Sequence, residues 1–352
     1  MKKNILFTLL IFIFPFANAQ IIQSFQFIKG SLHDGEKLMK AYLLPVENSF
    51  STINGSGLIH PEPITKKFSF KVTVDFMEVT APISDRTYDV NKLQLAEFKL
   101  SDPNRPIAQT FAGGFDSIKL ETKSTYRVPT ISYPFYTEKP LASFYTPKGI
   151  TRTIPFAAIG IAFSTQSNSL AFRVLPPLSL PGIDGKISLV GLTAQTKINK
   201  LFSSLNHIPF DIIISCGFEK IQLNINPNLK PMNSTDREYD NQKFFIHSTV
   251  IPLQVAISKI FFHNFNVFVN GGKSIAFTNT GLAGTYPLYK SDPTDSYNII
   301  IDKIKDPIEY ARNNSALFLK LGVGYYLKRI GFNGEFSFAK YKSMCIRVNV
   351  YI

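Results

Sequence analysis

The segment Gly271-Gly272-Lys273-Ser274 has the residue types that hold a phosphate group, because glycine amides and a lysine ammonium both bind anionic oxygens. A phosphate-binding loop also needs a glycine five residues before Gly272, and Val267 stands there instead. The residues after Ser274 look like a strand, so no helix N-terminus would help to hold a phosphate. We therefore interpret this segment as part of a strand.

Metal-binding and catalytic patterns are also missing from the sequence. No histidine stands at a close metal-ligand spacing from another histidine or a cysteine. Neither His-Glu-x-x-His nor Gly-x-Ser-x-Gly occurs. The sequence thus predicts no metal, no cofactor, no catalytic residue and no enzyme, although an active site assembled from distant strands stays open as an alternative. The five histidines are His33, His60, His207, His247 and His263.

The elements that would position any functional side chain are easiest to recognise at the C-terminus. Apolar residues recur there at every second position, with breaks at 329–331 and 339–342, and a period of two predicts strands. Three long strands ending at the last residue are typical of the closing strands of an outer-membrane β-barrel. The alternating apolar positions are Leu317, Leu319, Leu321, Val323, Tyr325, Leu327, Phe332, Phe336, Phe338, Met344, Ile346, Val348, Val350 and Ile352.

Other strands follow the same pattern upstream. Phe68 to Phe76 alternates cleanly, and further strands are predicted near 186–199, 209–224, 243–257 and 263–278. Residues 77–185 are interrupted by prolines and show only short strand candidates. Pro252 weakens the strand 243–257, because a central proline is poorly tolerated in a sheet.

The lengths of the connections test the barrel. In bacterial barrels the C-terminus lies in the periplasm, so the side of each connection follows from counting alternating strands back from Ile352. By this count the long connections 225–242 and 279–315 both fall on the outer side, where bacterial barrels carry their long loops. This requires Asn270-Gly271-Gly272-Lys273 to be a kink within one strand, although its Asn-Gly start also suits a hairpin turn. Residues 298–310, rich in isoleucine, are predicted to form a short amphipathic helix on the rim or in the mouth. Residues 225–242 are interpreted as a solvated loop.

The chain therefore predicts an all-β fold, an antiparallel transmembrane β-barrel of roughly 12–14 strands at ~20–25 residues per strand and connection. The alternative is a soluble β-sandwich, in which apolar residues also alternate. Several strands exceed ~8 residues, which favours the barrel because soluble strands usually have ~5–6.

The N-terminal region divides into two parts. Lys2 and Lys3, an apolar run and Ala17-Asn18-Ala19 predict a signal peptide at 1–19, and hence export to the outer membrane. Residues 20–65 are interpreted as a plug or arm, with a short helix near Ser31–Leu44 that ends at Pro45. The barrel is assigned to 66–352.

Polar residues that alternate with the apolar ones are expected to face the lumen. The simpler interpretation is that they form the solvent-exposed face of a sheet. Cys216 and Cys345 both fall in predicted strands, and whether they pair stays open. The lumen-facing candidates are Lys71, Asp75, Lys320, Glu335, Arg347 and Asn349.

The net charge of +13 is spread along the chain without a Lys/Arg run. For an exported protein, outer-membrane lipid, anionic lipopolysaccharide or a small solute are more natural partners than nucleic acid. The oligomeric state is not predicted.

Several segments in a fixed order carry a family likeness. They are Lys40-Ala41-Tyr42-Leu43-Leu44-Pro45, Phe68-Ser69-Phe70, Leu175-Pro176-Pro177, Leu180-Pro181-Gly182 and 190–198 before Pro209. In these segments the chain resembles an uncharacterised family of exported proteins from Bacteroidota-type bacteria, classed as a domain of unknown function, and the likeness spans nearly the whole mature chain. It also loosely resembles the long-chain fatty-acid transporters of outer membranes, whose N-terminal hatch implies a plug role for 20–65. No ligand-contacting motif can be matched.

Three hypotheses about function follow. The first is passive uptake or binding of a small, hydrophobic solute in a restricted lumen. The second is a structural or assembly role for the barrel at the cell surface. The third is a secreted, ligand-binding β-sandwich.

Overall fold

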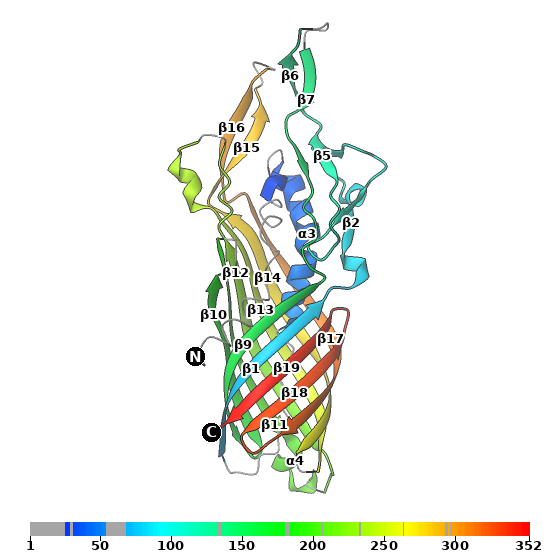
Figure 1. Ribbon diagram of the computed structural model, residues 1–352, viewed down its shortest axis with the longest axis vertical. Helices are drawn as coiled ribbons and strands as arrows, with labels where there is room; N and C mark the ends of the chain where they lie inside the picture. The colour runs from blue at the N-terminus through cyan, green and yellow to red at the C-terminus, as the bar shows by residue number, and fades with distance from the viewer. Residues whose placement is uncertain are drawn as a thin grey trace, which may run out of the picture.

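The computed structural model describes residues 25–28, 31–53, 68–131, 136–179, 184–205, 207–231, 234–262, 264–292, 295 and 297–352. Its main feature is a closed barrel with the strand order β1-β19-β18-β17-β14-β13-β12-β11-β10-β9 (Figure 1). β1 pairs with β19 on one side and with β9 on the other, and both pairs are antiparallel. The predicted barrel is confirmed, and the β-sandwich is wrong, because this ring of strands has closed on itself.

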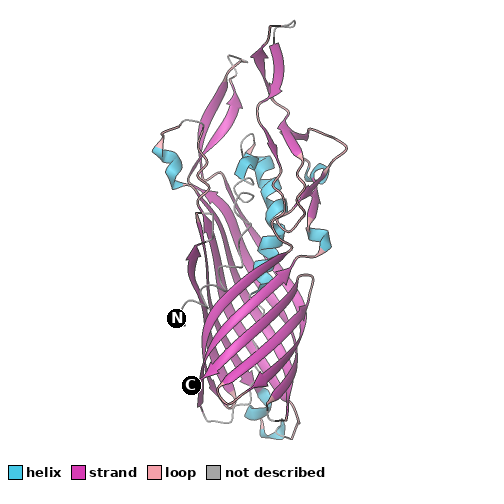
Figure 2. Ribbon diagram, viewed as in Figure 1, coloured by secondary structure: helices cyan, strands magenta, loops and turns pink. Residues whose placement is uncertain are grey.

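The barrel strands follow the predicted segments closely, and most are longer than predicted. Figure 2 shows that the fold consists mainly of strands, with few helices. Asn270 to Lys273 lies inside one continuous strand, as the loop parity required. Pro252 is accommodated where the β12–β13 ladder is interrupted, between the pairs Cys216–Leu253 and Glu219–Val250. The barrel strands are β1 (Phe68–Thr80), β9 (Thr153–Thr165), β10 (Asn168–Ser179), β11 (Gly185–Lys197), β12 (Asp211–Ile225), β13 (Lys243–Phe261), β14 (Phe265–Ala283), β17 (Ile308–Tyr326), β18 (Ile330–Phe338) and β19 (Lys342–Tyr351).

The predicted count of 12–14 strands was too high, because the ring contains ten. The estimate assumed that every strand with its connection takes the same number of residues, and two features of the chain contradict that assumption. Residues 81–152 form a single connection between β1 and β9, and β13, β14 and β17 each run for 19 residues.

The outer wall of the barrel carries a band of exposed apolar side chains, which we call the apolar belt. On β17 it extends from Leu317 to Tyr325, and above it the outward residues Asn313 and Ser315 are polar. Eight residue steps at ~3.3 Å give about 26 Å along the strand, or roughly 20 Å along the membrane normal at a tilt of ~40°. That height is close to the ~25 Å apolar band of outer-membrane barrels. No described helix is long and apolar enough to cross a membrane.

The two ends of the barrel differ. At the lower end in Figure 1 the connections are short, apart from the one that holds α4 (Ile198–Leu201) and η4 (Ser203–Leu205). At the upper end, the connections 81–152, 226–242 and 284–307 rise above the rim, and we call them the outer extension (Figure 1). Its elements are η2 (Ile83–Asp85), β2 (Thr87–Asp89), η3 (Val90–Leu93), β3 (Phe98–Leu100), β4 (Ile107–Gln109), β5 (Lys119–Thr122), β6 (Thr125–Pro129), β7 (Tyr136–Pro140), β8 (Ser143–Tyr145), η5 (Arg237–Asn241), β15 (Thr285–Ser291) and β16 (Ile299–Lys305).

The prediction of a helix at 298–310 was wrong, since these residues form β16 and the start of β17. The isoleucine-rich run Ile299–Ile301 is β-branched, which favours an extended chain. It pairs with Tyr289 to Ser291 of β15 in a two-stranded hairpin.

The N-terminal helix is longer than predicted. α3 (Leu32–Ile53) continues through Pro45, and η1 (Phe25–Ile28) packs beside it. Proline removes one helical hydrogen bond at that point. Contacts with β1, β9, β13, β14 and β17 hold the second half in place, so that tertiary packing outweighs the local preference to stop.

Candidate functional site

The lumen changes in character from top to bottom. Near the outer rim, inward side chains such as Ile221, Ile246 and Val79 are apolar and belong to the core that also contains Phe50 and Ile53 of α3. Lower down, charged side chains from neighbouring and next-nearest strands pair inside the lumen. Towards the lower end the inward residues are amides and hydroxyls, such as Asn266 and Ser258. The charged layer, which we call the ion-pair belt, consists of Asp75, Arg173, Glu219, Lys320, Glu335 and Arg347.

Asp75 on β1 is the centre of the ion-pair belt and is fully buried. Arg347 on the neighbouring β19 donates to both of its carboxylate oxygens, with Nη2 at 2.5 Å from Oδ2. Arg173 on β10 donates from Nη1 to Asp75 Oδ2 at 3.4 Å, and its Nη2 lies 2.5 Å from Glu219 Oε1 on β12. Four strands thus send charges to one point, where two cations neutralise two carboxylates.

A second pair completes the ion-pair belt. Lys320 Nζ of β17 lies 3.5 Å from Glu335 Oε1 of β18 and 4.6 Å from the centre of the Phe318 ring. Breaking a buried pair by removing one partner typically costs ~3–5 kcal/mol, because the other charge stays buried. The cavity beside Lys71, Arg173 and Arg347 has a volume of about 20 Å³, roughly enough for one water.

The six lumen-facing candidates are all buried, between 0% and 8% exposed. Asp75 is brought together with Arg347, and Lys320 with Glu335. Lys71 lines the small cavity, and Asn349 donates to the carbonyl oxygen of Gly331 at 3.5 Å, lower in the barrel.

Two members of the ion-pair belt were missed. Glu219 continues the parity of Asp211, Ile213 and Ser215, so alternation in that strand could have found it. Arg173 lies in β10, for which the sequence suggested only a short strand candidate, Ala171–Leu175, that ends at Pro176 and Pro177.

α3 lies in the mouth of the barrel and is anchored in both of its halves. Near its N-terminus, Asp34 accepts hydrogen bonds from the backbone N–H groups of three consecutive residues of the outer extension, 96–98, at 2.7–2.9 Å. Near its C-terminus, Glu47 accepts from Thr280 and Tyr310, both at 2.8 Å, and its Oε2 lies 2.7 Å from Arg312 Nε. Charge-assisted bonds of this kind are the strong ones, so the helix is fixed in the mouth.

Burial and neighbouring charges shift two groups at this mouth, above the apolar belt. Desolvation and the adjacent Glu47 raise the pKa of Tyr310 well above its usual range. Burial opposes ionisation of Asp85, but hydrogen bonds from Lys340, Tyr341 and Ser84 outweigh it and lower the pKa of that carboxyl.

A cavity of about 420 Å³ opens beside the mouth, and we call it the mouth groove. The C-terminal half of α3 lines it on one side, consecutive residues 312–317 of β17 on another, and the turn 339–341 between β18 and β19 at its end. Asn48 of α3 holds these walls together, since it donates to Tyr341 Oη at 3.2 Å and accepts from Asn314 at 2.9 Å. The groove is therefore preformed.

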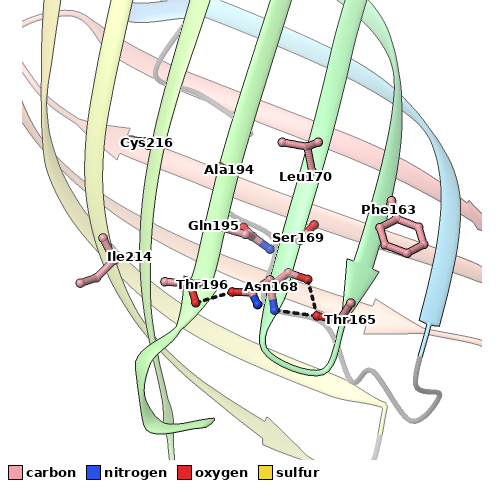
Figure 3. A pocket seen from close by; sticks show the side chains of 10 residues that line it. All are labelled: Phe163, Thr165, Asn168, Ser169, Leu170, Ala194, Gln195, Thr196, Ile214 and Cys216. Atoms are coloured by element: carbon pink, nitrogen blue, oxygen red, sulfur yellow. Dashed lines mark hydrogen bonds between the residues drawn. The ribbon is translucent and has the colours of Figure 1, made fainter. Parts of the chain in front are cut away.

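A second cavity, of about 400 Å³, lies low on the wall at β9 to β12 (Figure 3). Its side chains include the exposed Leu170, Phe163 and Ile214 of the apolar belt, with the small residues Ala194 and Cys216 between them. Thr196 donates to Asn168 Oδ1 at 2.7 Å near its lower edge (Figure 3). Because it opens on the outside of the belt, this depression belongs to the surface that contacts lipid.

The remaining chemistry-bearing residues do not cluster. Within the described ranges, no three His, Cys, Asp or Glu side chains are placed to hold a metal ion, and His60 and His263 lie outside those ranges. Cys345 is buried in the lumen whereas Cys216 is exposed on the outer wall, and both are free. Opposite faces of the wall preclude a disulfide between them. The predicted signal peptide, 1–19, also lies outside the described residues.

The loop interpreted as solvated, 225–242, keeps exposed charged side chains, and it also contacts the β15–β16 hairpin. Lys303 forms ion pairs with Asp236 and with Glu238, the latter at 2.9 Å.

A family model described as a family of unknown function (DUF6588) matches residues 1–352. A search of curated proteins finds no match.

Several solved barrels are similar in outline. The translocator domain of the autotransporter NalP from Neisseria meningitidis is 10% identical, covers 89% of this chain and 96% of its own, and gives a TM-score of 0.30. The outer membrane protease OmpT from Escherichia coli is 7% identical, with 82% and 97% covered and a TM-score of 0.28. A Pseudomonas aeruginosa FadL homologue is 10% identical, with 85% and 96% covered and a TM-score of 0.23. At these scores we take no function from them.

Proposed function

The chain belongs to a family of unknown function, DUF6588, and we propose that it is an outer-membrane barrel that serves as an assembly platform at the cell surface. In this proposal the barrel is an anchor in lipid, and the outer extension carries the contacts with other proteins. No catalytic step is assigned to it.

The ion-pair belt is the observation that carries the proposal. A barrel of eight strands is just wide enough for its side chains to fill the lumen, and porins with an aqueous channel need 16–18. Here ten strands enclose a chain of ion pairs that follows the inner wall from β19 through β1 and β10 to β12, with Asp75 and Glu219 fully buried. A lumen whose charges are buried and paired in this way supports an anchor better than a route for diffusion.

The ordered outer extension is the second support. Asp34 ties residues 96–98 to α3, and Lys303 joins loop 226–242 to the β15–β16 hairpin. A surface fixed by such contacts is preorganised, which lowers the entropic cost of binding a partner. The predicted export signal and the apolar belt support the outer membrane as the location, with its lipid and lipopolysaccharide as the surroundings.

Binding or passive uptake of a small, hydrophobic solute is the second candidate function. The mouth groove, about 420 Å³ in volume, favours it because pockets for small ligands occupy ~300–1,000 Å³. Uptake would require the ion-pair belt to rearrange, whereas binding in the groove would not.

Conductance across a planar lipid bilayer separates the two candidates. We expect the purified, folded protein to add no ionic conductance to the bare bilayer; steady open channels would overturn the platform proposal.

Removal of residues 20–65, checked for folding by a heat-shifted band on gels, sharpens the comparison. A solute channel closed by a hatch would gain conductance on this deletion. A platform would still add no conductance, because all six charged residues of the ion-pair belt lie outside 20–65 and would stay paired in the lumen.

A further inference from the structure

One barrel strand rises above the rim without a neighbour on one side. β17 pairs with β14 from Ile308 to Tyr325, but with β18 only from Leu319 to Tyr326. β18 ends at Phe338, where the chain turns back into β19. The segment Ile308–Phe318 therefore has a free edge, about 33 Å long at ~3.3 Å per residue.

The backbone along this free edge has no partner within the described parts of the chain. No hydrogen bond from another described residue reaches the backbone of 309–317 on the side away from β14. Every second residue of an edge strand directs its N–H and C=O outward, and such a row is a template for another strand. Extended polypeptide backbone is the chemical partner whose donors and acceptors match that spacing.

The mouth groove lies directly along this edge. Its lining includes every residue from Arg312 to Leu317. Successive residues of a strand point to opposite faces, so a cavity that touches all of them lies against the edge of the strand. α3 forms the inner wall through Leu44 and Asn48, and the turn 339–341 closes the lower end. An added strand would thus lie beside β17 with a wall behind it.

The charges in the groove have one exposed sign. Arg312 pairs with Glu47, and Lys340 Nζ lies 2.9 Å from Asp85 Oδ2. The carboxylate side chains are 1% and 7% exposed, whereas those of Arg312 and Lys340 are 30% and 63% exposed. Inside the groove a partner therefore meets these cations, which favours acidic side chains there. The exposed Glu309 lies on the same edge but outside the groove lining.

The height of the edge makes it accessible at the cell surface. Outward residues above Leu317, such as Asn313 and Ser315, are polar, so this part of β17 stands above the apolar belt. Lipid acyl chains do not compete for backbone groups there.

A second copy of the chain does not fit this edge. Two barrels in one membrane both send β17 in the same vertical direction, so their edges cannot pair antiparallel. With tilts of ~35–45° the two strands would cross steeply instead of lying side by side. The partner must supply a strand whose direction is free.

We propose that the free edge of β17 accepts an extended, acidic segment of a partner protein as an added strand. This rests on the proposed platform function and names the class of partner. The partner segment binds through main-chain hydrogen bonds to Ile308–Phe318 and places its acidic side chains near Arg312 and Lys340.

The test uses a fluorescent nine-residue peptide that alternates valine with threonine and aspartate. Binding to the full-length protein in detergent micelles is followed by fluorescence anisotropy, after a heat-shifted gel band has established folding. A peptide with lysine in place of aspartate reports the charge preference. A third peptide, N-methylated on the backbone at every second residue, cannot pair as a strand but keeps its charges.

We expect the acidic peptide to bind at least tenfold more tightly than the lysine peptide, and N-methylation to abolish binding. Lys340→Gln should weaken the acidic peptide about fivefold, while the matched variant Lys328→Gln, in the turn at the opposite end of the barrel, should leave it unchanged.

No binding of the acidic peptide, or equal binding of its N-methylated form, would overturn the proposal. Channel conductance by the wild-type protein would overturn the platform function instead, and it would leave peptide binding unaffected, so the two failures are distinguishable.

Discussion

A charge placed at the middle of the apolar belt should prevent stable insertion, whereas the same charge above it should not. Leu321 lies midway between Leu317 and Tyr325 on β17 and points outward, with 46% of its surface exposed. Asn313 also points outward on the same strand, above the belt. The pair Leu321→Arg and Asn313→Arg therefore differs mainly in depth.

The magnitude follows from the position of each residue. An arginine on the lipid face costs about 2–4 kcal/mol at the bilayer midplane and ~0–1 kcal/mol near the interface. At ~1.4 kcal/mol per tenfold change, Leu321→Arg should lower the folding equilibrium constant by roughly 30- to 700-fold, and Asn313→Arg by no more than about fivefold.

Refolding into phospholipid vesicles at graded urea concentrations measures both values, with the heat-shifted band as the readout of the folded state. An exposed leucine in water would tolerate arginine at little cost. Equal stability of the two variants would therefore refute the assignment of the belt to lipid.

Three further predictions concern the interior and the mouth. Arg347→Leu should lower the free energy of unfolding, measured by urea titration, by about 3–5 kcal/mol, because the buried Asp75 loses one of its two cationic partners. The double variant with Asp75→Leu should recover much of this loss; additive losses would contradict the pairing. Asp85→Asn should lower the free energy of unfolding at neutral pH, where the wild-type carboxylate is charged. Because the pKa of Asp85 in the folded protein lies below its usual 3.8, the difference in stability between variant and wild type should disappear as the pH falls through that lowered pKa. A difference that persists in strong acid would contradict this. Asp34→Ala should release residues 96–98, so that limited proteolysis cuts there at least several-fold faster; unchanged cutting would show that the anchor is dispensable.

The regular part of the fold was predictable because strand alternation is a local signal. Phe68 to Phe76 and the C-terminal strands face a lumen on one side and lipid on the other, so every second residue reports its side. Loop parity then placed the long connections at one end and required Asn270 to Lys273 to stay within a strand, as the structure has it.

The features that were missed depend on tertiary contacts. Pro45 stays inside α3 because five barrel strands pack on the helix, which no local pattern reports. The count of ten strands depended on recognising that 81–152 stays outside the ring, although it holds several short strands of its own.

The ion-pair belt shows the same limit. Alternation can place Asp75 and Glu219 on an inward face, but only the order of strands around the ring brings both to Arg173. The mouth groove is likewise set by where β18 ends relative to β17, a difference of register that a single sequence does not contain.

The most direct test of the membrane barrel is electrophoresis of the protein from fractionated membranes of its native host, with boiled and unboiled samples side by side. We predict that the protein is retained in the outer-membrane fraction and that the unboiled sample migrates faster, because the closed barrel resists unfolding by detergent. A protein found in the soluble fraction, with no difference between the two samples, would contradict it.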